Sequence, residues 1–140
     1  MQRYRLMAQN ALCAIATIFF TAVFAAGVAM SADISLAGSE WGFANETGKP
    51  ARYIQFAEDQ ASGNLGCNRF TGGYSFKDGE LNFRPLASTR MACAPEAMKR
   101  EQEFAALLSK VRFAEATHLK LVLKDADGEV LAELVRRDPD

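Results

Sequence analysis

The sequence predicts a mainly β fold of the α+β kind: a small curled antiparallel sheet or partly open β-barrel of about seven strands, covered by one α-helix. Short runs of aromatic and β-branched residues, separated by turn residues, fill most of residues 41–83. A single stretch, residues 95–111, has helical spacing of its apolar residues, and a last hairpin follows it. Such a set of elements buries the most apolar surface when the sheet curls and the helix covers it.

The first 32 residues predict a secretory signal peptide. Arg3 and Arg5 charge the beginning, no acid precedes Asp33, and residues 11–28 are apolar or small. The small residues that follow allow cleavage at several points between Ala29 and Asp33. An uncleaved membrane anchor is the alternative, because about 18 apolar residues lie near the lower limit for spanning a bilayer.

What remains after cleavage is one domain, residues 33–140, predicted to be periplasmic or secreted and monomeric. Cys13 lies near the start of the apolar run, where lipid attachment does not occur, so a lipoprotein is not expected. Removal of Arg3 and Arg5 from the 16 basic side chains leaves 14 against 17 acids, a net charge near −3. This balance, without a basic patch, argues against nucleic acid as a partner, and a cleaved chain keeps no membrane span.

The predicted elements of the first half are short. Residues 33–40 are small and polar and predict a flexible lead-in, followed by strands at residues 41–43 and 52–56. Turns are expected at residues 47–50 and 58–60, and glycines predict a bent or bulged strand over residues 62–68.

A hairpin is the clearest local prediction. Alternation of apolar and polar residues over 70–76 indicates a strand, residues 81–83 form the return strand, and Pro85 ends it. Asp78 and Gly79 lie between the two runs, and both residue types accept the positive φ that a tight hairpin turn requires.

One amphipathic helix of about four turns is predicted from Pro95, which suits the first helical position. Its helical spacing includes Met98, Glu101, Phe104, Ala105, Leu107, Leu108 and Val111. The end of the chain predicts a hairpin, with Leu119, Leu121 and Leu123 on one face of residues 118–123, a turn at residues 125–128 and a return strand over 130–135.

Cys67 and Cys93 are the two cysteines that an exported chain keeps, so one structural disulfide is expected between them. A redox role is the rival, but neither a Cys-x-x-Cys spacing nor a neighbouring histidine supports it. Zinc has still less support, because two cysteines and one distant histidine do not supply four ligands. No cofactor or metal is predicted.

The polar residues beside the cysteines form a candidate recognition surface: Asn68, Arg69, Thr89 and Arg90. A disulfide between Cys67 and Cys93 would bring these four residues together, and polar loop residues on a rigid scaffold often carry function. The alternative is structural: Asn68 and Thr89 satisfy backbone groups in irregular turns, while the arginines pair with carboxylates or remain solvated.

Other polar residues predict no chemistry. His118, the single histidine, lacks a nucleophile motif. Residues 125–129 lack the twelve-residue calcium pattern and are predicted to be a turn. Glu101 and Glu103, like Glu58 and Asp59, are predicted to be ordinary solvated acids.

The motifs at residues 63–74 and 86–93, together with Trp41, the run at residues 103–107 and the last hairpin, resemble the META domain family of HslJ-like heat-inducible envelope proteins. The resemblance covers about residues 36–137. It implies a small β-barrel-like fold with one helix, usually exported, and association with envelope or heat stress and, in some relatives, with antibiotic tolerance or secretion. No enzymatic activity is established for the family, so an enzyme is not expected. Many relatives are lipoproteins, whereas this chain lacks the lipid-attachment cysteine.

Three functions are weighed. The first is a non-catalytic envelope accessory that binds an unknown envelope protein. The second is a carrier of a small apolar ligand inside a barrel cavity, lined by aromatic residues: Phe43, Phe56, Phe70, Tyr74, Phe76 and Phe83. The third, a hydrolase or thiol enzyme, has the least support.

Overall fold

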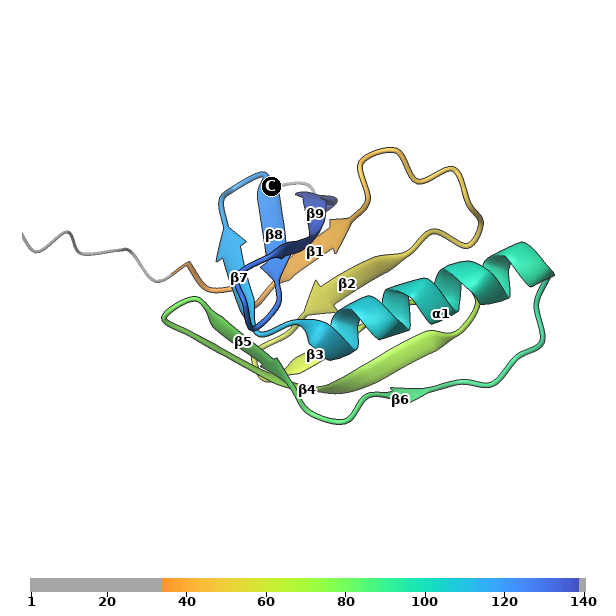
Figure 1. The fold of residues 1–140 in the computed structure, drawn as a ribbon, viewed down its shortest axis with the longest axis horizontal. Coiled ribbons are helices and arrows are strands. Elements are labelled where there is room, and N and C mark those ends of the chain that lie inside the picture. The colour runs from red at the N-terminus through yellow and green to blue at the C-terminus, as the bar shows by residue number, and fades with distance from the viewer. Residues whose placement is uncertain (1–33, 139–140) are drawn as a thin grey trace, which may run out of the picture. The chain divides into compact units, whose positions relative to one another are not determined.

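The computed structural model of the chain describes residues 34–138, which form nine β-strands and one α-helix (Figure 1). The predicted signal peptide, residues 1–32, lies outside the described residues. The elements, in chain order, are β1 (Ser39–Gly42), β2 (Tyr53–Phe56), β3 (Gln60–Asn64), β4 (Arg69–Lys77), β5 (Glu80–Phe83), β6 (Ala87–Ser88), α1 (Pro95–Lys110), β7 (Phe113–Ala116), β8 (Lys120–Lys124) and β9 (Val130–Arg136).

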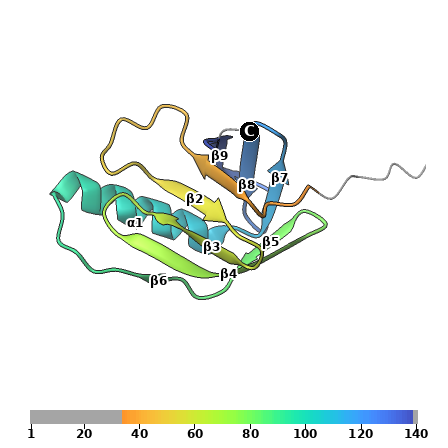
Figure 2. The same ribbon diagram turned by 180° about the vertical axis from the view of Figure 1, so that it is seen from behind.

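Eight of these strands close into an antiparallel barrel. Neighbouring strands follow the order β3-β2-β1-β9-β8-β7-β5-β4, and β3 also pairs with β4, which completes the ring. The short strand β6 lies outside the ring and pairs with β4 alone. Seen from behind, β3 and β4 run side by side in front of α1 (Figure 2). The predicted mainly β class is confirmed, with more strands than the seven expected.

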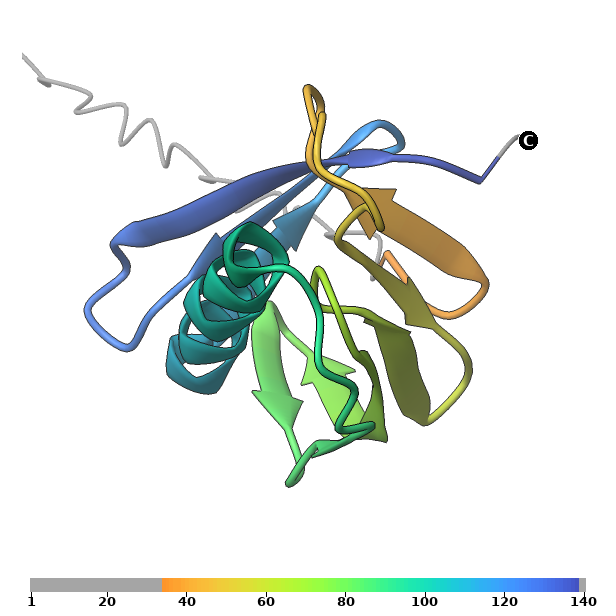
Figure 3. The ribbon, with the colours of Figure 1, turned by 90° about the vertical axis from the view of Figure 1, so that its right-hand side faces the viewer.

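The helix α1 begins at the predicted proline and covers the barrel beside β5 (Figure 3). Pro95 occupies the first helical turn, where its missing N–H costs no hydrogen bond. Phe104 and Leu108 are buried in the core, and Phe104 meets the ring of Phe43 edge to face at 5.4 Å. The strands β5 and β7 pair at a single position, Glu80 with Phe113, so the helix supplies apolar contacts where this wall of the barrel is short.

The barrel interior is filled by side chains. Its fully buried members come from every side of the ring and from the helix: Leu36, Trp41, Ile54, Phe56, Leu81, Phe104, Leu108, Leu121, Leu123 and Leu134. Phe56 and Tyr74 meet edge to face with their ring centroids 4.8 Å apart. Close packing of this kind makes the barrel a core and not a channel. No helix within residues 34–138 is long and apolar enough to cross a bilayer.

The hairpin between β4 and β5 forms as predicted. Asp78 has φ of 53° and Gly79 has φ of 81°, the left-handed values that a two-residue turn needs. Lys77 and Glu80 close the turn as cross-strand partners. On β4 the predicted alternation also holds, because Phe70 and Tyr74 are buried while the residues between them are half-buried or exposed.

The predicted flexible lead-in, residues 33–40, is wrong within the described residues. Leu36 is 1% exposed and belongs to the core, and β1 already begins at Ser39. The Ser39 hydroxyl donates to the Leu36 carbonyl at 2.5 Å and accepts a hydrogen bond from the Trp41 indole at 2.6 Å. One leucine among small residues therefore anchors a segment whose composition looked polar.

Three further points of the strand assignment need correction. The strand β7 was not predicted, because its alanines carry little β signal. Leu119, expected on the buried face with Leu121 and Leu123, is 73% exposed. It lies in the turn between β7 and β8, where Thr117 and Lys120 are hydrogen-bonded through backbone and side chain. The predicted bent or bulged strand over residues 62–68 is instead a regular β3 and a loop that turns at Gly66, φ 122°. The predicted close approach of backbones is present at Gly63, where a Cβ atom would clash with the Tyr53 carbonyl oxygen.

Candidate binding surface beside the disulfide

The disulfide between Cys67 and Cys93 is present, as predicted. It joins the loop after β3 to the segment that precedes α1, with 6.0 Å between the Cα atoms and a sequence separation of 26. Cys67 is buried, whereas Cys93 is half-buried. The crosslink therefore attaches the C-terminal end of the mostly exposed segment of residues 84–92 to the barrel.

Asn68 is the centre of a polar network next to the crosslink, here called the Asn68 hub and formed by Asn68, Thr89, Met91 and Glu101. The Asn68 side-chain carbonyl accepts hydrogen bonds from the Met91 backbone N–H at 2.7 Å and from the Thr89 hydroxyl at 2.9 Å. Its amide donates to the two Glu101 carboxylate oxygens at 3.1 and 3.0 Å. Asn68 is 2% exposed, so this network replaces the water that its amide has lost.

Glu101 corrects the prediction of an ordinary solvated acid. Its carboxylate also accepts a hydrogen bond from the Asn68 backbone N–H at 2.8 Å. Glu101 is on α1 and Asn68 follows β3, so this contact fastens the helix to the loop that carries the disulfide. Hydrogen bonds to an ionised carboxylate are among the stronger ones in proteins.

The four residues of the predicted recognition surface lie together but have different surroundings. Asn68 and Thr89 satisfy backbone groups, since the Arg69 backbone N–H donates to the Thr89 hydroxyl at 3.2 Å. Asn68 and Thr89 therefore have the structural role that was the alternative to recognition. Arg69 and Arg90 are exposed. Recognition of a partner by the four residues stays a prediction.

An apolar groove, here called the α1–β6 groove, lies between α1 and the segment that carries β6. It has a volume of about 470 Å³. Six of its lining side chains are apolar: Leu65, Phe70, Phe83, Pro85, Leu86 and Ala105. Polar lining comes from Arg84, Ser88 and Ser109. The sequence did not reveal this groove, because Leu65 and Ala105 are brought together only by the packing of the helix.

The arginines of the described residues fall into two groups, those that form an ion pair and those that do not. Arg52, Arg100, Arg136 and Arg137 each form an ion pair. Within the described residues no ion pair involves the other four, which are Arg69, Arg84, Arg90 and Arg112. Arg84 lines the groove, and the guanidinium of Arg112 donates to the Ser109 carbonyl at 3.1 Å. Thr89 donates its N–H to the Arg69 carbonyl, which places Arg69 of β4 and Arg90 beside the end of β6.

The loop of residues 43–52 is fixed by a different charged cluster. The Glu46 carboxylate accepts from Arg52 at 2.7 Å and from Arg100 of α1 at 3.1 Å, and its side chain is 8% exposed. Burial raises the pKa of Glu46, but the hydrogen bond and charge of Arg52, the Gly48 N–H and the charge of Arg100 outweigh burial and lower that pKa below its ordinary value. The cluster attaches the loop to the helix.

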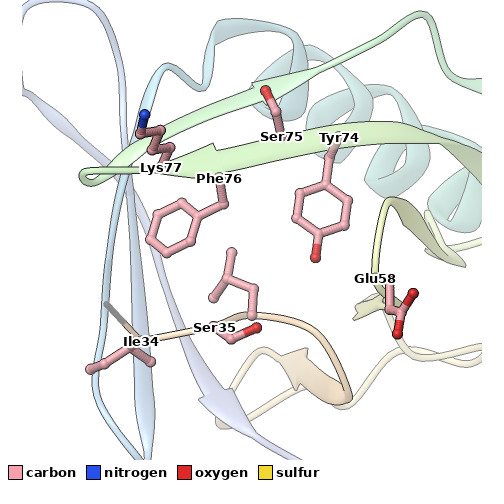
Figure 4. A pocket seen from close by; sticks show the side chains of 8 residues that line it. Ile34, Ser35, Glu58, Tyr74, Ser75, Phe76 and Lys77 are labelled. Carbon is pink, nitrogen blue, oxygen red and sulfur yellow. The ribbon is translucent and has the colours of Figure 1, made fainter. Parts of the chain in front are cut away.

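A second cleft, of about 250 Å³, lies where the chain enters the barrel (Figure 4). In Figure 4 the rings of Tyr74 and Phe76 point toward the segment at Ser35, while Ser75 points away from it. The Tyr74 hydroxyl donates to the Ala57 carbonyl at 2.7 Å. Burial, together with the negative charge of Asp59, raises the pKa of Tyr74. The hydroxyl is therefore a structural donor.

The remaining candidates occupy turns. His118 is exposed between β7 and β8. Asp125 accepts hydrogen bonds from the backbone N–H groups of Asp127 at 3.0 Å and Glu129 at 2.9 Å, so its carboxylate closes the predicted turn. No group of three or more His, Cys, Asp or Glu residues suited to a metal ion occurs in the part of the chain that the structure describes.

The fold and its crosslink define a small module: a closed antiparallel barrel with one covering helix and a disulfide beside that helix. A family model for the META domain matches residues 35–138, and the chain belongs to the META domain family. The predicted family is confirmed.

Two solved structures are similar to this chain and show the same fold. One is an NMR structure of a protein from Burkholderia xenovorans, 22% identical, with a TM-score of 0.64 over 74% of this chain and 85% of that chain. The other is an NMR structure of a protein 26% identical, with a TM-score of 0.54 over 73% of this chain and 90% of that chain. No curated protein matches the chain.

Proposed function

We propose that this META domain is an exported, non-catalytic accessory of the cell envelope that acts by binding another protein. The observation that carries the proposal is the contrast between a fixed scaffold and an open surface. The disulfide and the Asn68 hub hold the segment of residues 84–93, and that segment forms one wall of the α1–β6 groove. Rigid presentation of an apolar groove favours binding, because little ordering entropy is lost when a partner arrives.

A non-catalytic role is supported by the state of the reactive side chains. Within the described residues the two thiols are joined, and a disulfide offers no thiolate nucleophile. His118 is exposed in a turn and lies outside the groove. The groove itself brings one arginine and two serines to an apolar floor, with no base beside either serine among its lining residues.

Export is part of the proposal and has a direct test. Cell fractionation, followed by mass measurement of the recovered protein, should find it outside the cytoplasm with a mass that corresponds to a start between Ala29 and Asp33. A cytoplasmic, full-length product would contradict export.

Association with heat stress is tested by a time course of the protein's abundance after heat shock. An abundance that does not change would contradict this association.

Partner binding is tested by retrieving the tagged full chain from the envelope of cells that express it. A partner should be recovered in a saturable way, and excess untagged protein should compete for it. Retention that does not saturate, or that competitor protein leaves unchanged, would contradict the proposal.

The groove also favours a second function, carriage of a small apolar ligand. Its volume lies within the range of small-molecule sites, about 300–1,000 Å³. The barrel interior, which was weighed as the place for such a ligand, is occupied by core side chains. Native mass spectrometry of gently purified protein should then show an added mass that Ala105→Trp removes, and an unmodified mass would count against this function.

A further inference from the structure

The strand β6 presents a free backbone edge beside the groove. In the antiparallel pair of β4 with β6, Ser88 lies opposite Phe70 and Ala87 opposite Thr71. The Thr89 N–H donates to the Arg69 carbonyl at 3.0 Å, and the Arg69 N–H donates to the Thr89 hydroxyl at 3.2 Å, so the backbones of Arg69 and Thr89 face each other at this position of the ladder. Hydrogen-bonded and non-bonded pairs alternate along an antiparallel ladder, so the backbone N–H and C=O of Ser88 point away from β4. Ser88 also lines the groove.

A free strand edge and an apolar groove together suit an extended polypeptide. The edge supplies hydrogen bonds to the backbone of an added strand, and side chains of alternate residues can enter the groove. Phe70 and Leu86 provide apolar contact directly beside Ser88. A small apolar molecule would use the groove but leave the edge of β6 without partners.

The charges around the groove define the chemistry of the occupant. Arg84 lies at one end of the segment that carries β6 and Arg90 at the other, and neither forms an ion pair within residues 34–138. No carboxylate is among the groove's lining residues, and the Glu101 carboxylate of α1 is held by Asn68. Arg84 lines the groove, and Arg90 lies two residues beyond the lining residue Ser88. Cations without an ion-pair partner complement carboxylates on a partner and favour its association.

We propose that the α1–β6 groove binds an extended segment of a partner protein in which apolar and acidic residues alternate, and that this segment adds as a strand to the free edge of β6. The inference rests on the proposed protein-binding function and names the class of partner. Apolar side chains of the segment contact Phe70, Leu86 and Ala105, while its carboxylates pair with Arg84 and Arg90.

The test uses a displayed library of random ten-residue peptides, selected against the full chain. The synthetic form of the most enriched peptide is then titrated against the wild type and variants. Ala105→Trp fills the groove, and Ala106→Trp is its matched control, because Ala106 is also exposed on α1 but does not line the groove. Circular dichroism and thermal unfolding confirm that both variants fold.

Enriched peptides should alternate apolar and acidic residues. Ala105→Trp should weaken their binding about tenfold or more, since it blocks the centre of the contact, while Ala106→Trp changes the affinity less than about twofold. The double variant Arg84→Glu/Arg90→Glu should weaken binding about tenfold and reduce its salt dependence. Lys49→Glu, in the loop of residues 43–52, is the charge control and should leave the affinity unchanged.

Four results would overturn the inference. They are a selection without enriched peptides, peptides that bind Ala105→Trp as tightly as wild type, enrichment of basic peptides, and a dimer of the chain that Ala105→Trp dissociates. If the selection enriches no peptide and the protein binds dodecanoate, the groove is assigned to small apolar molecules.

The outcome separates this inference from the proposed function. An envelope partner that still binds Ala105→Trp keeps the protein-binding function and refutes the groove as its site. If peptides are selected but no envelope partner is recovered, the groove is kept as a peptide-binding site and the proposed envelope function is refuted.

Discussion

Two neighbouring regions of this domain differ in how their polar and apolar groups are satisfied. In the Asn68 hub every hydrogen-bonding atom of a buried side chain has a partner, as holds throughout residues 34–138. In the α1–β6 groove, a few residues away, apolar side chains face an open space, and Arg84 of the lining and the neighbouring Arg90 lack ion-pair partners within the described residues. The hub is complete in the isolated domain, whereas the groove gains contacts only when something binds. We therefore attribute stability to the hub, and the proposed function places binding at the groove.

Removal of the crosslink should have the largest effect on stability. The double variant Cys67→Ala/Cys93→Ala is expected to lose about 3–4 kcal/mol of unfolding free energy, because the disulfide closes a 26-residue loop in the unfolded chain. Urea unfolding measures the loss. Wild-type protein unfolded in a reducing agent is the control and should lose a similar amount, and equal stability in oxidised and reduced forms would contradict a structural role.

Replacement of the hub residue comes next. Asn68→Ala should destabilise the domain by about 2–4 kcal/mol, because it leaves the Met91 N–H and the Glu101 carboxylate without their buried partner. Asn82→Ala is the matched control, since Asn82 makes a single exposed side-chain hydrogen bond, to Glu80. The comparison fails if the two variants unfold at the same urea concentration.

The Glu46 cluster should give a smaller effect that depends on pH. The folded-state pKa of Glu46 is lowered, so its stabilisation is present above the unfolded value of 4.5 and is lost as pH falls through the folded value. Glu46→Gln should therefore cost about 1–2 kcal/mol at neutral pH and almost nothing once the wild-type carboxyl is protonated. Thermal unfolding from pH 7 to pH 3 measures this, with the exposed Glu103→Gln as control. A cost that stays constant with pH would show that the charge is unimportant.

Variants at the groove rim should hardly change stability. Arg84→Ala and Arg90→Ala remove cations that make no ion pair in the described domain, and each is expected to alter the unfolding free energy by less than about 0.5 kcal/mol. The same variants should weaken binding of the selected peptide. A loss of stability as large as that of Asn68→Ala would place these arginines in the scaffold and remove the distinction between the two regions.

Local features of the sequence predicted much of the scaffold. Asp78 and Gly79 form the expected turn because their preference for positive φ is a property of the residues themselves. Pro95 begins the helix for a similarly local reason. The Cys67–Cys93 pairing followed from the number of cysteines expected in an exported chain.

Features that depend on distant contacts were missed. Leu36 is a core residue because the barrel end closes over it, and its small neighbours carry no sign of this. Glu101 resembles any acid on the polar face of a helix until the packing of α1 brings it to Asn68. The groove has the same origin, since Leu65 and Ala105 are 40 residues apart in sequence and meet through the placement of the helix.

Hydrogen exchange at two adjacent amides tests the division between scaffold and binding edge most directly. With the selected peptide at saturation, the Ser88 amide should exchange at least about tenfold more slowly, because it gains a hydrogen bond from the added strand. The Thr89 amide should exchange at an unchanged rate, because it already donates to the Arg69 carbonyl. A saturated complex in which Ser88 exchanges as fast as in the free protein would contradict the account.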